Sequence, residues 1–178
     1  MRPNSSIHKL PSNQTILDLT DKKLTFIPMK FSKSSRLTTL ILTKNQIREL
    51  PKNLNKLLHL EMAFNELTEI PKDIEEGIQT YPSLEILDFA HNSIKTIPES
   101  IFNHPTIRKL VLFCNDIESI DCSKSRISFV DLGRNKLTKI PLLPETVSTL
   151  ILDCNYIQDL ENLPKSVKFL SLSRNLLT

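Results

Sequence analysis

Residues 37–47 decide the fold, and they read Leu-Thr-Thr-Leu-Ile-Leu-Thr-Lys-Asn-Gln-Ile. Apolar residues hold the first, fourth, sixth and eleventh places of this stretch, and asparagine holds the ninth. In an extended strand successive side chains point to opposite faces, so Leu40 and Leu42 face one side while Ile41 faces the other. The stretch therefore predicts a short strand, a turn at the asparagine and a return of the chain to the core.

The same form recurs along the whole chain. Seven copies keep the asparagine, and an earlier copy around Leu17 and Leu19 has Lys22 in its place. The copies begin near residues 14, 37, 57, 84, 107, 127, 147 and 167, so the steps are 23, 20, 27, 23, 20, 20 and 20 residues. A form repeated at this period predicts units that stack into a solenoid.

These repeats resemble the leucine-rich-repeat family over about residues 14–178. The mixture of 20- and 23-residue steps, often with a trailing Leu-Pro or Ile-Pro pair, is similar to intracellular members of that family. The resemblance implies an α/β leucine-rich-repeat solenoid, a right-handed superhelix or horseshoe with a parallel β-sheet on its concave face. It also implies a mostly irregular or polyproline convex side with few short helices.

The repeated asparagine has a structural role. Its side-chain amide can both donate and accept hydrogen bonds, so it can satisfy backbone groups of the turn that would otherwise be buried without a partner. We therefore expect a ladder of stacked asparagines along the solenoid. Its members are Asn45, Asn65, Asn92, Asn115, Asn135, Asn155 and Asn175.

On the convex side most repeats have little room for a helix. The long third repeat can hold one over residues 72–80, with Asp73 as the candidate N-terminal cap. The fourth repeat can hold a turn near residues 99–102.

The domain organisation follows from the repeats. We expect residues 1–13 to form an N-terminal cap and residues 14–178 to form one leucine-rich-repeat domain of about eight repeats, the last incomplete. A solenoid needs polar caps over its terminal repeats, and the sequence stops halfway through a repeat. We expect either a longer protein or an end covered by a partner or a second copy of the chain.

Composition narrows the class of function. Glycine occurs only twice, at Gly77 and Gly133, which excludes a glycine-rich phosphate loop. The formal net charge is +3, and basic residues alternate with acidic ones instead of clustering, so we expect no nucleic-acid partner.

The termini and the thiols bear on localisation. Residues 1–14 are polar and lack the apolar core of a secretory signal, and no apolar run reaches the roughly 18 residues of a membrane span. Three cysteines do not form a disulfide framework. We therefore expect a cytoplasmic protein with reduced thiols and no membrane span.

The concave face carries side chains that stacking of the repeats does not require. Several are phenylalanines with charged residues between them, a combination typical of protein interfaces. The alternative is that some phenylalanines pack along the sheet and shield their neighbours. The expected protein-binding residues are Glu61, Phe64, Asp88, His91, Lys109, Phe113, Phe129, Asp131 and Arg134.

Three of these residues could also form a different kind of site. Glu61, Asp88 and His91 are oxygen and nitrogen donors from adjacent repeats, as a metal or acid–base site needs. A mixed polar surface fits better, because the pattern implies neither a cleft nor a second shell of ligands. Cys114 and Cys154 hold the same place two repeats apart, about 10 Å, which is too far for a disulfide. We expect no metal, no cofactor and no catalytic residue.

The sequence thus predicts a protein–protein interaction module, part of a larger signalling protein, that binds a protein partner on its concave face. One alternative is the regulatory or targeting arm of an enzyme, such as the arms attached to protein phosphatase 2C, adenylyl cyclase or kinase domains, or of a bacterial effector ubiquitin ligase. Another is self-assembly, as a dimer, through the uncapped C-terminal repeat.

Overall fold

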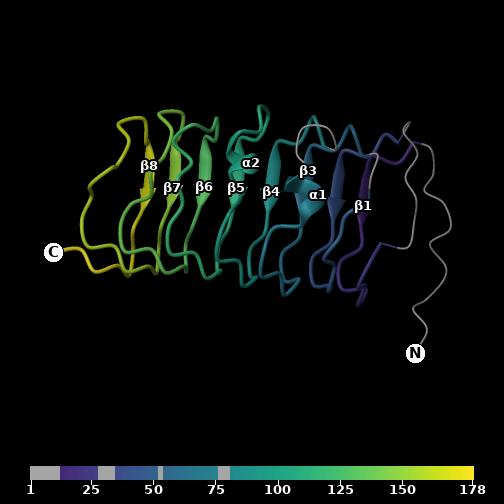
Figure 1. The fold of residues 1–178 in the computed structure, drawn as a ribbon, viewed down its shortest axis with the longest axis horizontal. Coiled ribbons are helices and arrows are strands. Elements are labelled where there is room, and N and C mark those ends of the chain that lie inside the picture. Colours follow the sequence, from purple (N-terminus) through teal and green to yellow (C-terminus); the bar gives the residue numbers. More distant parts are fainter. Residues whose placement is uncertain (1–12, 28–34, 52–53, 76–80) are drawn as a thin grey trace.

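The protein is a coil of short parallel strands in a computed structural model that describes residues 13–27, 35–51, 54–75 and 81–178. The strands form one sheet in the order β1 to β8, so each repeat pairs only with the repeats before and after it. Figure 1 shows the strands side by side along the long axis, with β1 and β8 at opposite ends. The strands are β1 (Ile16–Asp18), β2 (Thr39–Ile41), β3 (His59–Glu61), β4 (Ile86–Asp88), β5 (Lys109–Val111), β6 (Phe129–Asp131), β7 (Thr149–Ile151) and β8 (Phe169–Ser171).

The register of the sheet follows the sequence motif. The middle residue of each strand lies opposite the middle residue of the next, as in Leu40 opposite Leu60 and Leu110 opposite Val130. From β1 to β7 the middle side chain is buried while its two neighbours are more exposed. This confirms the predicted parallel-sheet solenoid, because the alternation places one apolar residue inside and two variable ones outside in every strand.

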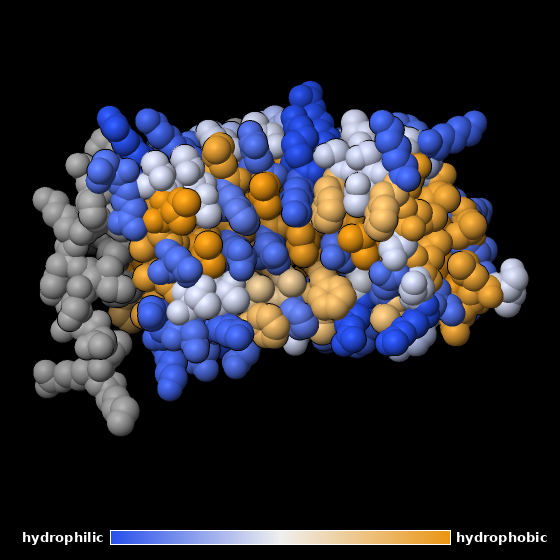
Figure 2. Space-filling model, turned by 180° about the vertical axis from the view of Figure 1, so that it is seen from behind, coloured by the Kyte–Doolittle hydropathy of each residue, from blue (hydrophilic) through white to orange (hydrophobic). Residues whose placement is uncertain are grey.

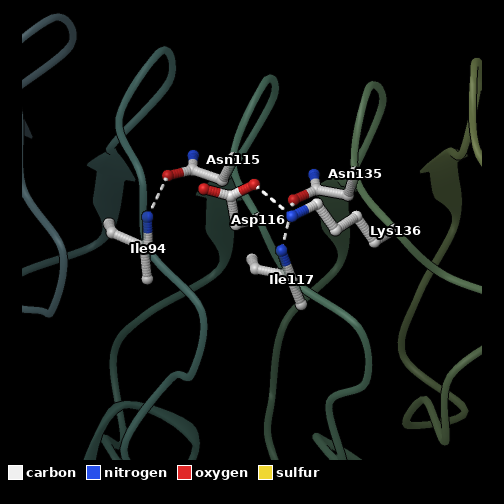
Figure 3. A network of polar contacts seen from close by, with 6 residues as sticks. All are labelled: Ile94, Asn115, Asp116, Ile117, Asn135 and Lys136. Carbon is white, nitrogen blue, oxygen red and sulfur yellow. Dashed lines mark hydrogen bonds and ion pairs between the residues drawn. The ribbon is translucent and has the colours of Figure 1, made fainter.

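The asparagine ladder is present, and each asparagine ties its own repeat to the preceding one. Asn135 donates from Nδ2 to the carbonyl oxygens of Leu112 (2.9 Å) and Leu132 (3.0 Å). Its Oδ1 accepts the backbone N–H of Ile117 at 3.0 Å. Figure 3 shows this bond together with the equivalent one from Ile94 to Asn115. The same Oδ1 contact from the preceding repeat recurs at Asn45, Asn65, Asn92, Asn155 and Asn175.

The residue before each ladder asparagine adopts a left-handed backbone conformation. Its φ lies between 52° and 58° in every repeat, although none of these residues is glycine. The turn directs its N–H to a carbonyl of the following repeat, as from Arg134 to Asp153 at 2.7 Å, and leaves the side chain outside. The members of this row are Lys44, Phe64, His91, Cys114, Arg134, Cys154 and Arg174, and Asp21, before Lys22 of the first repeat, has the same conformation.

The opposite side of the coil is mostly irregular, with two short helices. Helix α1 covers Lys72–Glu75, and the rest of the helix predicted over residues 72–80 lies outside the described residues. The expectation that Asp73 caps this helix is wrong, because Asp73 lies within it and accepts the N–H of Leu50 at 3.0 Å. The carboxylate therefore bridges two repeats. Helix α2 covers Glu99–Phe102, where a turn was predicted.

The two ends of the coil differ from its middle. The predicted N-terminal cap falls almost entirely on residues 1–12, which lie outside the described residues. In the last coil Leu170 and Leu172 are only partly buried, whereas Leu150 and Leu152 of the preceding coil are fully buried. Within the described part of the chain, no helix has the length and apolar character needed to span a membrane.

Candidate interaction surface on the sheet face

The predicted binding residues come together on the outer face of the sheet, from β3 to β6 and the turns that follow these strands. The face drawn in Figure 2 carries apolar side chains along the middle of the long axis, with hydrophilic side chains above and below them. The parallel register keeps equivalent positions of successive repeats next to each other, so residues far apart in sequence form continuous rows. The rows described here contain all nine residues singled out from the sequence.

One row consists of aromatic and cationic side chains that contact one another across four repeats. The rings of Phe64 and His91 are stacked, with centroids 4.0 Å apart and planes 10° from parallel. The His91 ring meets Phe113 edge-on at 5.2 Å, and the guanidinium carbon of Arg134 lies 5.7 Å from the centre of the Phe113 ring. We call these four residues, Phe64, His91, Phe113 and Arg134, the aromatic row.

The left-handed turn explains how this row is built. Phe64, His91 and Arg134 all precede a ladder asparagine, and all have the positive φ that turns the side chain outward. Phe64 leaves 42% of its surface exposed, although a phenylalanine of the core would be covered. The turn at each ladder asparagine thus sets the direction in which Phe64, His91 and Arg134 point.

Phe113 enters the row from a different position, which elsewhere in the sheet carries smaller residues. The equivalent places hold Ala63, Ala90 and Gly133. A Cβ added to Gly133 would lie 3.0 Å from a ring carbon of Phe113, so the ring uses the space that glycine leaves free. Phe113 is therefore half-buried, and in part it packs along the sheet as the alternative interpretation of the sequence held. The pairing of Phe113 with Gly133 was not predicted, although the sequence shows small residues at this position of the neighbouring repeats.

A second group of the predicted binding residues lies on the strands themselves, from β3 to β6. The ammonium of Lys109 lies 4.6 Å from the centre of the Phe129 ring, in cation–π contact. Glu61, on β3, accepts the hydroxyl of Thr43 at 2.7 Å. Asp88 and Asp131 each accept, on Oδ1, the backbone N–H two residues later at 2.9 Å.

The two aspartates on this face have perturbed ionisation. Burial raises the pKa of Asp88, and the negative charge of Glu61 raises it further, while the Ala90 N–H acts in the opposite direction. Burial likewise raises the pKa of Asp131, with the negative charges of Asp153 and Asp88 adding to it and the Gly133 N–H opposing it. Negative charge is therefore costly at both of these aspartates.

Among the described residues, no group of three or more histidine, cysteine, aspartate or glutamate side chains is placed to hold a metal ion. Asp88 accepts the Ala90 N–H, while His91 is stacked on Phe64 and meets Phe113 edge-on. Cys114 and Cys154, partly buried, are free thiols.

Comparisons with known proteins agree with this architecture. The family model described as Leucine Rich Repeat matches residues 83–104. Lumican of Gallus gallus is 27% identical over 163 residues, covering 77% of this chain and 48% of lumican. The chain thus spans about half the length of that relative.

Solved structures show the same fold. A leucine-rich-repeat protein of Leptospira interrogans superposes with a TM-score of 0.72 at 23% identity, covering 92% of this chain and 50% of that one. The leucine-rich repeats of FLRT2, solved in an octameric complex with latrophilin 3 and Unc5D, match with a TM-score of 0.74 at 22% identity, covering 94% of this chain and 54% of that chain. With its eight stacked repeats and its asparagine ladder, the chain has the leucine-rich-repeat fold.

Proposed function

We propose that the sheet face binds a protein partner, with the aromatic row as the centre of contact. The observation that carries this proposal is the row itself: four neighbouring side chains across four repeats, all at positions outside the leucine and asparagine motif. Aromatic residues and arginine are the side chains most enriched at the energetic centres of protein interfaces.

The surroundings of the row support the proposal. Lys109, Asp88 and Asp131 lie beside it, so an apolar and aromatic centre is bordered by charges that can select a partner. The row also rests on a rigid ladder, which lowers the entropy cost of presenting it to a partner. Leucine-rich repeats commonly serve as extended interaction surfaces. We further propose that this takes place in the cytoplasm, in line with the free thiols of Cys114, Cys122 and Cys154.

The test is a pull-down from cells that make the protein, with the chain and two variants as bait. Phe64→Ser removes one exposed aromatic side chain from the row. Tyr156→Ser removes another exposed aromatic side chain that lies outside the row, since 53% of Tyr156 is exposed and it follows a ladder asparagine.

We expect the chain and the Tyr156→Ser variant to retain the same partner and the Phe64→Ser variant to lose it. The melting temperatures of the three proteins should agree closely, because both substitutions are at exposed positions. Equal retention by both variants would contradict the placement of the binding site on the sheet face.

A further inference from the structure

Beside the aromatic row, the sheet face carries two aspartates, Asp88 and Asp131, that form no ion pair within the described residues. In the row that follows the buried residue of each strand, Glu61, Asp88, Val111 and Asp131 occupy β3, β4, β5 and β6 in register. Val111 is therefore flanked on both sides by an aspartate. The two aspartates are two strand spacings apart, about 10 Å between their backbones.

Neither aspartate is neutralised by an ion pair in the part of the chain that the structure describes. There the one ion pair joins Lys136 to Asp116, on the asparagine edge of the coil (Figure 3). Lys109 is on the strand between the two aspartates, and its positive charge lowers the pKa of both. Its ammonium, however, contacts the Phe129 ring and forms no ion pair with either carboxylate.

Each aspartate has one oxygen committed to the fold. Oδ1 of Asp88 accepts the Ala90 N–H, and Oδ1 of Asp131 accepts the Gly133 N–H. Within the described residues, no hydrogen bond reaches Oδ2 of either side chain. Both carboxylates thus keep an acceptor for a group that comes from outside.

Burial makes these carboxylates strong acceptors for a cation. Both have a raised pKa because burial, together with neighbouring negative charge, penalises their ionised form more than the backbone N–H donors and Lys109 favour it. A cation placed beside them would relieve that penalty, since opposite charges attract more strongly where water is excluded. The apolar side chains of Val111 and Phe113 beside them offer a surface for a long aliphatic stem or a planar guanidinium.

We propose that the sheet face around Val111 receives a lysine or arginine side chain of the protein partner, with Asp88 and Asp131 as its acceptors. This inference rests on the proposed function, because it names the partner's chemistry at the same face. A basic side chain followed or preceded by an apolar residue would use both the carboxylates and the aromatic row.

The experiment selects peptides from a random displayed library on the immobilised chain and measures their dissociation constants for four proteins. The first is the chain itself, and the second is the double variant Asp88→Asn/Asp131→Asn. Asparagine keeps the Oδ1 acceptor for the turn, so the fold should be preserved while both charges are lost. The third is Asp121→Asn/Asp159→Asn, which makes the same change of charge at two exposed aspartates that also accept a backbone N–H two residues later. The fourth is Phe64→Ser.

We expect selected peptides to carry a lysine or arginine next to an apolar residue. Their affinity should fall roughly tenfold or more in the Asp88→Asn/Asp131→Asn variant, and by as much when the peptide's basic residue becomes glutamine. The Asp121→Asn/Asp159→Asn variant should bind like the original chain.

Two results would overturn the inference, and they can be told apart. Peptides that lose binding in Phe64→Ser but show no basic residue and no response to Asp88→Asn/Asp131→Asn would reject the basic partner while leaving the sheet face as the binding site. Peptides that bind equally to all four proteins would reject both the basic partner and the proposed function.

Discussion

The row of ladder asparagines and the sheet face run side by side along the same repeats. The residue type is constant in the asparagine row and variable on the sheet face. In the asparagine row one residue type occurs in seven successive repeats, each with the same hydrogen bonds to the preceding repeat. One position earlier in the chain, the residue type changes from lysine to phenylalanine, histidine, cysteine and arginine while φ stays between 52° and 58°. The ladder fixes the backbone and so leaves the adjacent side chain free to vary.

This difference separates what holds the protein together from what it presents. Ladder and core side chains are buried and bonded to neighbouring repeats, so their replacement should lower the free energy of unfolding. Side chains of the sheet face have few such bonds, and their replacement should change binding more than stability. The following predictions test this division, beginning with the largest effect.

The core should respond most strongly. Leu112, fully buried beneath the sheet, should cost about 2–5 kcal/mol of unfolding free energy when replaced by alanine, because the substitution leaves a cavity. Phe64→Ala, which removes more atoms but from an exposed ring, should cost under about 1 kcal/mol. Urea unfolding followed by circular dichroism measures both. Equal losses of unfolding free energy in the two variants would show that Phe64 contributes to stability as much as a core residue does.

The ladder should come next. Asn135→Ala removes the acceptor for the Ile117 N–H and the donor to two leucine carbonyls, all of them buried, so we expect a loss of about 1–3 kcal/mol. Asn175 makes the equivalent bonds at a more exposed place in the last coil, where water can replace them. Asn175→Ala should therefore cost less. A larger loss at Asn175 than at Asn135 in the same unfolding assay would contradict this ranking.

Replacing a residue of the left-handed row by glycine should change the unfolding free energy less, and should raise it instead of lowering it. Lys44 is exposed and has φ of 57°, a conformation that costs a residue with a Cβ more than it costs glycine. Lys44→Gly should therefore raise the unfolding free energy by up to about 1 kcal/mol. Lys139 is also exposed but is not among the residues with positive φ, so Lys139→Gly should lower it by roughly 0.5–1 kcal/mol. Melting curves of the two variants should shift in opposite directions.

The face itself should gain a little stability when its charge is removed. Because burial raises the folded-state pKa of Asp131 above its ordinary value of 3.8, ionisation opposes folding, and stability is lost as pH rises through the folded pKa. Asp131→Asn keeps the Gly133 hydrogen bond without the charge, so its melting temperature should exceed that of the original chain at pH 7. The difference should vanish below the ordinary aspartate pKa. If Asp131→Asn were less stable than the original chain at pH 7, nearby positive groups would already stabilise the ionised Asp131 more than burial opposes it.

Much of this architecture could be predicted from sequence because each repeat needs the same few residues. The strand positions, their parallel order and the ladder follow from a motif in which leucine and asparagine have one possible role each. The role of Asp73 could not be predicted in this way. A short acidic side chain near a helix start suits a cap, but here it bonds to Leu50, 23 residues earlier, and such a contact depends on how neighbouring repeats stack.

The sheet face was predicted as a set of positions but not as a set of contacts. Strand alternation turns five of the nine residues outward, namely Glu61, Asp88, Lys109, Phe129 and Asp131. The other four lie in the turns that follow the strands. The stacking of Phe64 on His91 and the packing of Phe113 against Gly133 depend on side-chain directions after the left-handed turn, which no single repeat encodes. Their role in binding stays a prediction.

The central claim is that the partner contacts the aromatic row, and site-specific photo-crosslinking in cells that make the protein tests it most directly. A photoreactive phenylalanine analogue would replace Phe64 in one sample and Leu142 in another. Leu142 is also an exposed apolar side chain, but it lies on the opposite side of the coil, where it forms an isolated bridge with Asp121. We predict a crosslinked partner from position 64 and none from position 142. Crosslinking from position 142 alone would place the binding site on the other side of the coil and contradict the account.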